Sequence, residues 1–136
     1  MPRMRDGGLF LAQGFMGAFL SVLFLQSGLD KVFDWSGNKA YITGYLEKTP
    51  MRPVAGLLFF VITVLEVLAG VTSAAGVLST VLVRSTELSL VGAFLSASSI
   101  VGLFLGQRLA KDYAAAAAMV PYFLASIVAL VVFGMR

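Results

Sequence analysis

The chain has 136 residues, of which 59% are hydrophobic and 12% charged, with a formal net charge of +3. This length allows one small domain, and no basic run is long enough to follow a nucleic-acid backbone, which excludes nucleic acid as a partner. The chain contains no cysteine and no histidine. It therefore lacks disulfides, thiolate chemistry and the usual ligands of haem, copper and zinc, so we expect no metal site and no covalently bound cofactor.

Four long stretches with at most one charge fill almost the whole chain. Each reaches the roughly 20 apolar residues that a helix needs to cross the hydrocarbon core of a bilayer. The charged residue within them is Glu66, and the mean hydropathy of the chain is +0.92. The sequence therefore predicts an all-α fold, an integral membrane four-helix bundle that forms a single domain over residues 1–136. Its helices are expected at about residues 8–31, 53–77, 84–108 and 113–134.

The first stretch follows a short basic segment, which is also the pattern of a secretory signal peptide. The apolar run is longer than a typical signal core, and no A-x-A pattern closes it. We expect an uncleaved first membrane helix. Small residues recur in it at helical spacing, as they do in the other three stretches, and such stripes line the inner faces of membrane bundles. The stripe in the first helix consists of Gly14, Gly17, Ser21 and Gly28.

The long connection between the first two predicted helices is rich in aromatic residues. It holds Trp35, Tyr41 and Tyr45, and Asn38 is placed to cap a short helix. Aromatic rings on one helix face are typical of a segment that lies in the membrane interface. We predict a short interfacial helix here. It serves either as an anchor or as a lid or docking surface at the mouth of the bundle.

Glu66 is the strongest candidate for a functional residue and is our candidate catalytic group. It lies about 20 Å along its helix from Pro53, near the middle of the bilayer. A charged side chain at that depth costs at least about 2.5–3.5 kcal/mol, so the acid must be paired, hydrogen-bonded or neutral. Its helical neighbours Thr63, Gly70 and Ser73 are small, which predicts that it points into the bundle. It could contact a quinone, relay a proton or hold helices together.

Two sets of polar side chains are expected, one toward each end of the bundle. Gln13, Arg84 and Glu87 are expected to form an inner polar zone with Glu66, with Arg84 and Glu87 paired one helical turn apart. Arg84 is either the counter-charge of an ionised Glu66 or extends to the membrane interface. At the opposite rim, Lys31 and Arg108 either hold an anion together or form ordinary salt bridges with Asp30 and Asp112.

Pro121 should kink the fourth helix as a matter of packing.

The orientation of the bundle is weakly encoded. A count of Lys and Arg favours the side with the long connection as cytoplasmic, whereas the acids Asp30 and Asp34 after the first helix favour cytoplasmic termini. We expect a multi-pass protein of the bacterial inner membrane with its termini in the cytoplasm.

The chain resembles the DoxX-like family of small four-helix membrane proteins. The matching residues are Gly28-Leu29-Asp30-Lys31, the Leu65–Gly70 segment, Gly76, Arg84, Gln107-Arg108 and Asp112-Tyr113-Ala114. The resemblance covers nearly the whole chain. It implies association with a membrane redox or respiratory complex, as in the small subunit of thiosulfate:quinone oxidoreductase, with quinone or lipid as the bound molecule.

Three functions remain open at this point. The first is an accessory or anchoring subunit that borders a quinone site. The second is a catalytic subunit that passes electrons from thiosulfate or a related anion to quinone, with Glu66 at the quinone and Lys31 and Arg108 at the anion. The third, a proton or solute transporter, is less favoured because four helices are few for alternating access.

Overall fold

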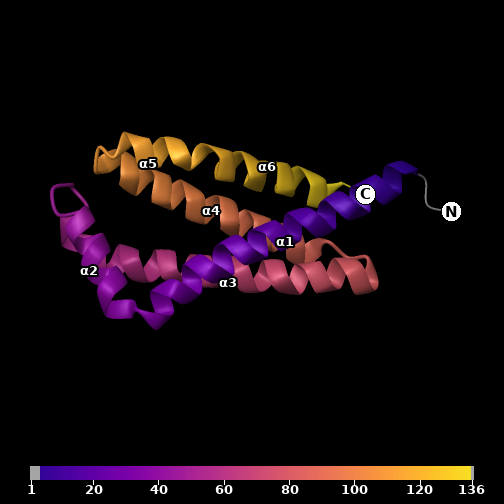
Figure 1. The fold of residues 1–136 in the computed structure, drawn as a ribbon, viewed down its shortest axis with the longest axis horizontal. Coiled ribbons are helices and arrows are strands. Elements are labelled where there is room, and N and C mark those ends of the chain that lie inside the picture. Colours follow the sequence, from indigo (N-terminus) through magenta and orange to yellow (C-terminus); the bar gives the residue numbers. More distant parts are fainter. Residues whose placement is uncertain (1–3, 136) are drawn as a thin grey trace.

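The computed structural model describes residues 4–135, and within them the chain is helical apart from short connections. The helices are α1 (Met4–Phe33), α2 (Trp35–Tyr45), α3 (Ala55–Val83), α4 (Glu87–Leu109), α5 (Tyr113–Ala118) and α6 (Val120–Gly134), and a 3₁₀ turn at Arg52–Val54 precedes α3 (Figure 1).

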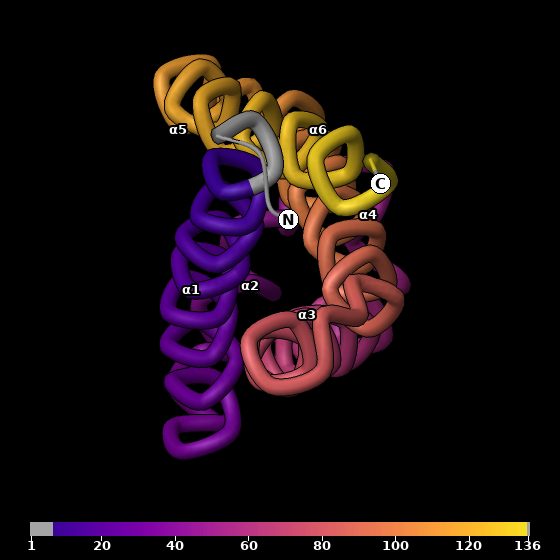
Figure 2. Tube along the Cα trace, turned by 90° about the vertical axis from the view of Figure 1, so that its right-hand side faces the viewer, coloured from indigo at the N-terminus to yellow at the C-terminus, as the bar shows by residue number. Residues whose placement is uncertain are grey.

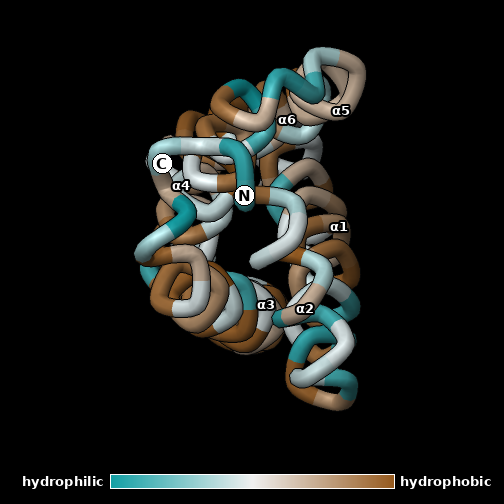
Figure 3. The backbone as a smooth tube through the Cα atoms, turned by 90° about the vertical axis from the view of Figure 1, so that its left-hand side faces the viewer, coloured by the Kyte–Doolittle hydropathy of each residue, from teal (hydrophilic) through white to brown (hydrophobic). Residues whose placement is uncertain are grey.

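Four segments of this structure are long and apolar enough to cross a membrane. They are Gly7–Phe33, Arg52–Val83, Glu87–Leu109 and Tyr113–Gly134. Large apolar side chains such as Phe15, Leu82 and Val131 are exposed along them, as contact with lipid requires. Figure 3 shows the hydrophobic stretches of α1 and α3 in brown. The chain is therefore an integral, multi-pass membrane protein with an all-α bundle fold, as predicted.

The membrane helices pack in a closed order. In chain order α1 packs against α3, α3 against α4 and α4 against α6, and α6 returns to α1 (Figure 2). The start of α1, the connection from α3 to α4 and the end of α6 share one end of the bundle, while α2 and α5 lie at the other end (Figure 1). We refer to these as the terminal end and the connector end.

Two helix crossings bring backbones into close contact through glycine. A Cβ atom at Gly70 of α3 would lie 2.6 Å from the backbone nitrogen of Leu25 in α1, and a Cβ at Gly92 of α4 would lie 2.9 Å from the backbone nitrogen of Ser73 in α3. No other residue fits at these points without moving a helix. Gly14, in contrast, has open space beside it, so the stripe predicted for the first helix is used only in part.

The boundary between α3 and α4 differs from the prediction. The second membrane helix, expected to end near residue 77, continues to Val83, and the next one begins at Glu87 rather than at residue 84. Arg84 closes α3 in the left-handed region, with φ 56°, and its N–H donates to the carbonyl of Thr80. A residue in that conformation ends one helix and cannot open the next.

The predicted interfacial helix is present as α2, but its cap is different. Asp34 is the N-cap, and its side chain accepts a hydrogen bond from the N–H of Gly37 at 3.3 Å. Asn38 lies inside the helix and donates to the carbonyl of Asp34 at 2.9 Å, so the expectation that Asn38 caps the helix was wrong. Trp35 packs edge-on against Phe59 of α3, with 4.6 Å between ring centroids.

The fourth membrane segment is interrupted where proline predicted a kink. α5 ends at Ala118, and α6 starts at Val120 with Pro121 as its second residue. Proline has no N–H to donate, and its ring collides with the carbonyl four residues earlier. The interruption therefore follows directly from the sequence.

Candidate functional site

An ion pair lies inside the bundle between α1 and α3. Lys31 Nζ is 2.7 Å from Glu66 Oε2, and the side chains are 15% and 1% exposed. Lys31 Nζ also donates to the carbonyl of Ser27, one turn earlier in α1, at 3.4 Å. Glu66 points inward, as its small helical neighbours predicted, and its charge has a partner within hydrogen-bonding distance.

The α1–α3 crossing explains why these two side chains meet. Gly28 of α1 abuts Val67, where a Cβ would lie 2.9 Å from the Val67 backbone nitrogen, and Gly70 abuts Leu25. Lys31 is one turn after Gly28, and Glu66 is one turn before Gly70. In two antiparallel helices that touch at these glycines, the next turn brings residues 31 and 66 to the same level.

These side chains therefore pair differently from what the sequence suggested. Arg84 cannot be the counter-charge of Glu66, because it closes the same helix 18 residues later, which is about 27 Å along the axis. Lys31, expected at the rim either to hold an anion with Arg108 or to pair with Asp30, pairs with Glu66 instead. The position along the axis at which α1 crosses α3 decided this partner.

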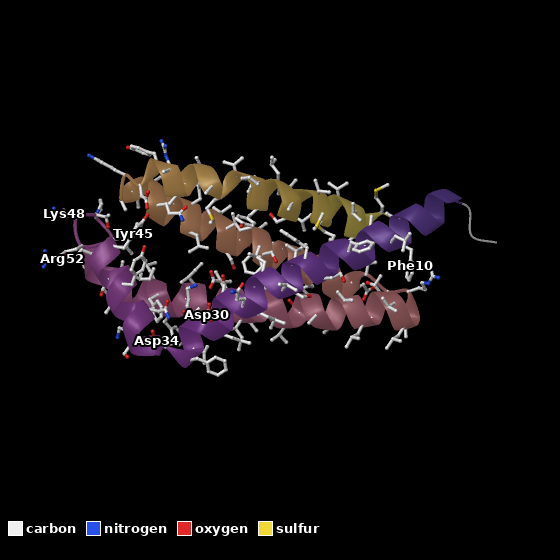
Figure 4. The ribbon with its side chains drawn as sticks, in the orientation of Figure 1. Phe10, Asp30, Asp34, Tyr45, Lys48 and Arg52 are labelled. Carbon is white, nitrogen blue, oxygen red and sulfur yellow. The ribbon has the colours of Figure 1, made fainter. Side chains whose placement is uncertain are left out.

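The remaining members of the inner polar zone, Gln13, Arg84 and Glu87, come together at the terminal end. They line one cavity of about 510 Å³. Gln13 is buried, and its Nε2 donates to the carbonyl of Val132 in α6 at 3.0 Å. The guanidinium of Arg84 lies 3.8 Å from the ring centroid of Phe10, a residue at the right-hand end of Figure 4. Arg84 and Glu87 do not form the predicted pair, because Arg84 belongs to the end of α3 rather than to α4.

The connector end shows a contact that the sequence did not predict. The hydroxyl of Tyr45, at the end of α2, donates to Asp112 Oδ2 at 2.7 Å, and Oδ1 of Asp112 accepts from the N–H of Ala115 as the cap of α5. The pKa of Tyr45 is raised from 10.0 to about 12, first by burial and then by the hydrogen bond to Asp112 and the negative charge of that carboxylate. Tyr45 is at the left-hand end in Figure 4, beside Lys48 and Arg52.

This bond holds the segment after α2 across the connector end of the bundle. Leu46 follows Tyr45 and is buried, and its side chain reaches Gly106 of α4. The sequence offered one signal: a tyrosine at the end of a short helix and an aspartate that caps another. Nothing in it placed the two together, since they are 67 residues apart.

The predicted rim pairs are not formed. Among the side chains of residues 7–135, Lys31 pairs with Glu66 and not with Asp30, and Arg108 does not pair with Asp112. The guanidinium of Arg108 lies 4.6 Å from the ring centroid of Tyr113 instead. Three buried side-chain atoms make no hydrogen bond among the described residues: Ser73 Oγ, Gln107 Oε1 and Glu66 Oε2, of which the last faces the Lys31 ammonium in the ion pair.

In the described part of the chain, no three residues of the types His, Cys, Asp and Glu come together. A molecule bound here would be held by the Lys31–Glu66 pair or by the terminal cavity. The first site combines an ammonium group with a carboxylate in an apolar setting. The second combines a guanidinium, a carboxylate, an amide and hydroxyl groups.

Comparison with known proteins identifies one family. No curated protein and no solved structure matches this chain. The DoxX family model matches residues 17–99, which is more than half of the chain and includes both members of the buried ion pair. The protein belongs to the DoxX family.

Proposed function

We propose that this chain is an accessory subunit of a larger membrane redox complex, which anchors partner subunits and borders a quinone site beside Lys31 and Glu66. The buried ion pair is the observation that carries the proposal. Membership of the DoxX family supports it, and so does the lack of cysteine and histidine. A chain without these residues depends on other carriers for electrons.

The ion pair has the hydrogen-bonding capacity that a quinone carbonyl requires. An ammonium group has three hydrogens to donate. In Lys31 one is donated to the Ser27 carbonyl at 3.4 Å, and the ion pair with Glu66, at 2.7 Å between Nζ and Oε2, occupies another side of the ammonium group. The third remains for a carbonyl oxygen, and the Lys31 side chain is partly exposed. Glu66 would hold the ammonium group in place.

The catalytic alternative has less support. Oxidation of thiosulfate or a similar anion needs a free positive site, for which Lys31 and Arg108 were the candidates. Lys31 already forms an ion pair with Glu66, and the guanidinium of Arg108 lies over the ring of Tyr113. An accessory role does not need that anion site.

Extraction in a gentle detergent followed by native mass spectrometry tests both parts of the proposal. We expect stoichiometric partner proteins and retained quinone. Lys31→Met should lower quinone retention and leave partner retention unchanged, with Glu47→Gln in the exposed connection as the matched control. A monodisperse lone chain from native membranes would refute the accessory role. Equal quinone retention in Lys31→Met would refute the site.

We also propose that the protein lies in a bacterial inner membrane with its termini in the cytoplasm. The start of α1 and the end of α6 lie at one end of the bundle (Figure 1), so a single reporter decides the orientation. A fluorescent protein that folds only in the cytoplasm, fused after residue 136, should be bright. A dark fusion with an active periplasmic reporter at the same point would reverse the assignment.

A further inference from the structure

We propose that the cavity at the terminal end binds the headgroup of an aminophospholipid, with its phosphate at Arg84 and its ammonium group at Glu87. This site is separate from the Lys31–Glu66 pair and does not depend on the function proposed above. Four observations carry the proposal: the size of the cavity, its depth in the membrane, its opposite charges and its apolar wall.

The cavity is large enough for a small polar group. Its volume of about 510 Å³ lies within the range of small-molecule sites. It is formed by α1, by the end of α3, by the turn into α4 and by the end of α6. The lining residues are Leu9, Phe10, Gln13, Thr80, Arg84, Ser85, Thr86, Glu87 and Met135.

The depth of the cavity matches the lipid headgroups. Arg84 follows immediately after the membrane span that ends at Val83, and Glu87 is the first residue of the next span. The ends of hydrophobic spans lie where the hydrocarbon core gives way to the headgroup layer. A ligand that enters this cavity from the bilayer therefore presents its polar head to Arg84 and Glu87.

The cavity is lined by one positive and one negative side chain. Arg84 and Glu87 do not form an ion pair with each other. The guanidinium of Arg84 is held against Phe10 at 3.8 Å, and its backbone has a φ of 56°, a conformation that non-glycine residues seldom adopt. An arginine fork is suited to bidentate hydrogen bonding with phosphate. The Glu87 carboxylate in the same cavity adds a position for an ammonium group, which an aminophospholipid headgroup supplies and that of phosphatidylglycerol lacks.

The walls of the cavity are tied to α6. The hydroxyl of Thr86 donates to the carbonyl of Phe133 at 2.8 Å, and the amide of Gln13 donates to the carbonyl of Val132 at 3.0 Å. These bonds fix the start of α4 and the face of α1 against the same turn. The apolar residues Leu9, Phe10 and Met135 line the cavity beside the charges, so it suits an amphipathic molecule better than a free phosphate ion.

Native mass spectrometry of the full chain in nanodiscs tests the proposal. The nanodiscs contain equal amounts of phosphatidylethanolamine and phosphatidylglycerol with the same acyl chains, and lipid adducts are counted after release into detergent. The wild type should retain phosphatidylethanolamine in preference. Arg84→Gln should lower retention of both lipids by roughly tenfold, the size of one hydrogen bond to a charged group. Glu87→Gln should keep lipid bound but abolish the preference.

Two controls complete the experiment. Lys48→Gln removes an exposed charge at the connector end and should leave retention unchanged. Inorganic phosphate added before release should not displace the lipid. Displacement would identify a free anion as the ligand and overturn the proposal. Equal retention of the two lipids by the wild type would do the same, as would unchanged retention in Arg84→Gln. Glu87→Gln replaces an exposed side chain, so its outcome does not depend on how well Arg84→Gln folds.

Discussion

Two crossings in this bundle share one backbone geometry and differ in the side chains beside it. At the α1–α3 crossing, the glycine contact at Gly70 lies one turn from the Lys31–Glu66 pair. At the α3–α4 crossing, the contact at Gly92 lies beside hydroxyl groups, among them that of Ser73. Close packing of membrane helices therefore does not require charge in this protein.

The difference shows what the ion pair contributes. The hydration that two charges lose on burial offsets much of their Coulombic attraction, so a buried ion pair adds little to stability. Removing one partner is nevertheless costly, because the other charge then stays buried without a partner. Between α3 and α4 the glycine contacts are accompanied by a hydroxyl–hydroxyl hydrogen bond between Thr80 and Ser89 at 3.3 Å rather than by an ion pair. We therefore expect the charges at the α1–α3 crossing to contribute to the choice of partner between the two helices more than to stability.

Removing one charge should have the largest effect. We expect Lys31→Met to lower the free energy of unfolding by about 3–5 kcal/mol, because it leaves the Glu66 carboxylate buried without a partner. Glu66→Gln should cost less, since Lys31 is partly exposed near the end of α1 and its long side chain can reach the interface. The double variant should recover most of the loss. Unfolding in detergent measures the free energy of unfolding of all three variants. Equal losses in Lys31→Met and Glu66→Gln would contradict the prediction that removing the lysine costs more.

Adding one carbon atom to the glycine contacts should have an intermediate effect at both crossings. Gly70→Ala and Gly92→Ala each place a Cβ less than 3.0 Å from a backbone nitrogen of the facing helix. We expect each to lose about 1–3 kcal/mol, the usual cost of overpacking. Gly14→Ala, with open space beside it, is the matched control. If only one of the two alanine variants lost stability, close glycine packing would not stabilise both crossings.

Removing the hydroxyl of Tyr45 should have the smallest effect and changes neither crossing. Tyr45→Phe loses one hydrogen bond to Asp112, worth about 1 kcal/mol. Its signature is the pH dependence. The pKa in the folded state, about 12, lies above the ordinary 10.0, so the unfolded chain loses this proton first. The stabilisation of the fold by the Tyr45 hydroxyl is therefore fully present below pH 10 and is lost as the pH rises through about 12.

Fluorescence of Trp35, the one tryptophan of the chain, reports on this bond. Trp35 lies in α2 against Phe59, so release of α2 should change its emission between pH 10 and 12 in the wild type and not in Tyr45→Phe. Tyr122→Phe, on the half-exposed surface of α6, should behave as the wild type. An alkaline transition that persists in Tyr45→Phe would show that another group is responsible.

Much of the fold could be predicted from local pattern. The four spans follow from the length of the apolar stretches, the aromatic cluster predicted α2, and Pro121 predicted the interruption before α6. The small residues around position 66 predicted that Glu66 points inward, and it is 1% exposed. The short motifs around Lys31 and Glu66 also carried the family resemblance, which the family model confirms. Whether Glu66 has a function is a prediction still to be tested.

What only the tertiary structure decided is how far each helix is shifted along its neighbour. A helix advances 1.5 Å per residue, and a shift of one turn gives every inward side chain another partner without changing its face. For that reason the sequence alone determined that Glu66 points into a membrane bundle and that Lys31 lies toward one rim, while the crossing of α1 and α3 decided that they pair. The same shift decided that Arg84 and Glu87 line a separate cavity and that Tyr45 reaches Asp112.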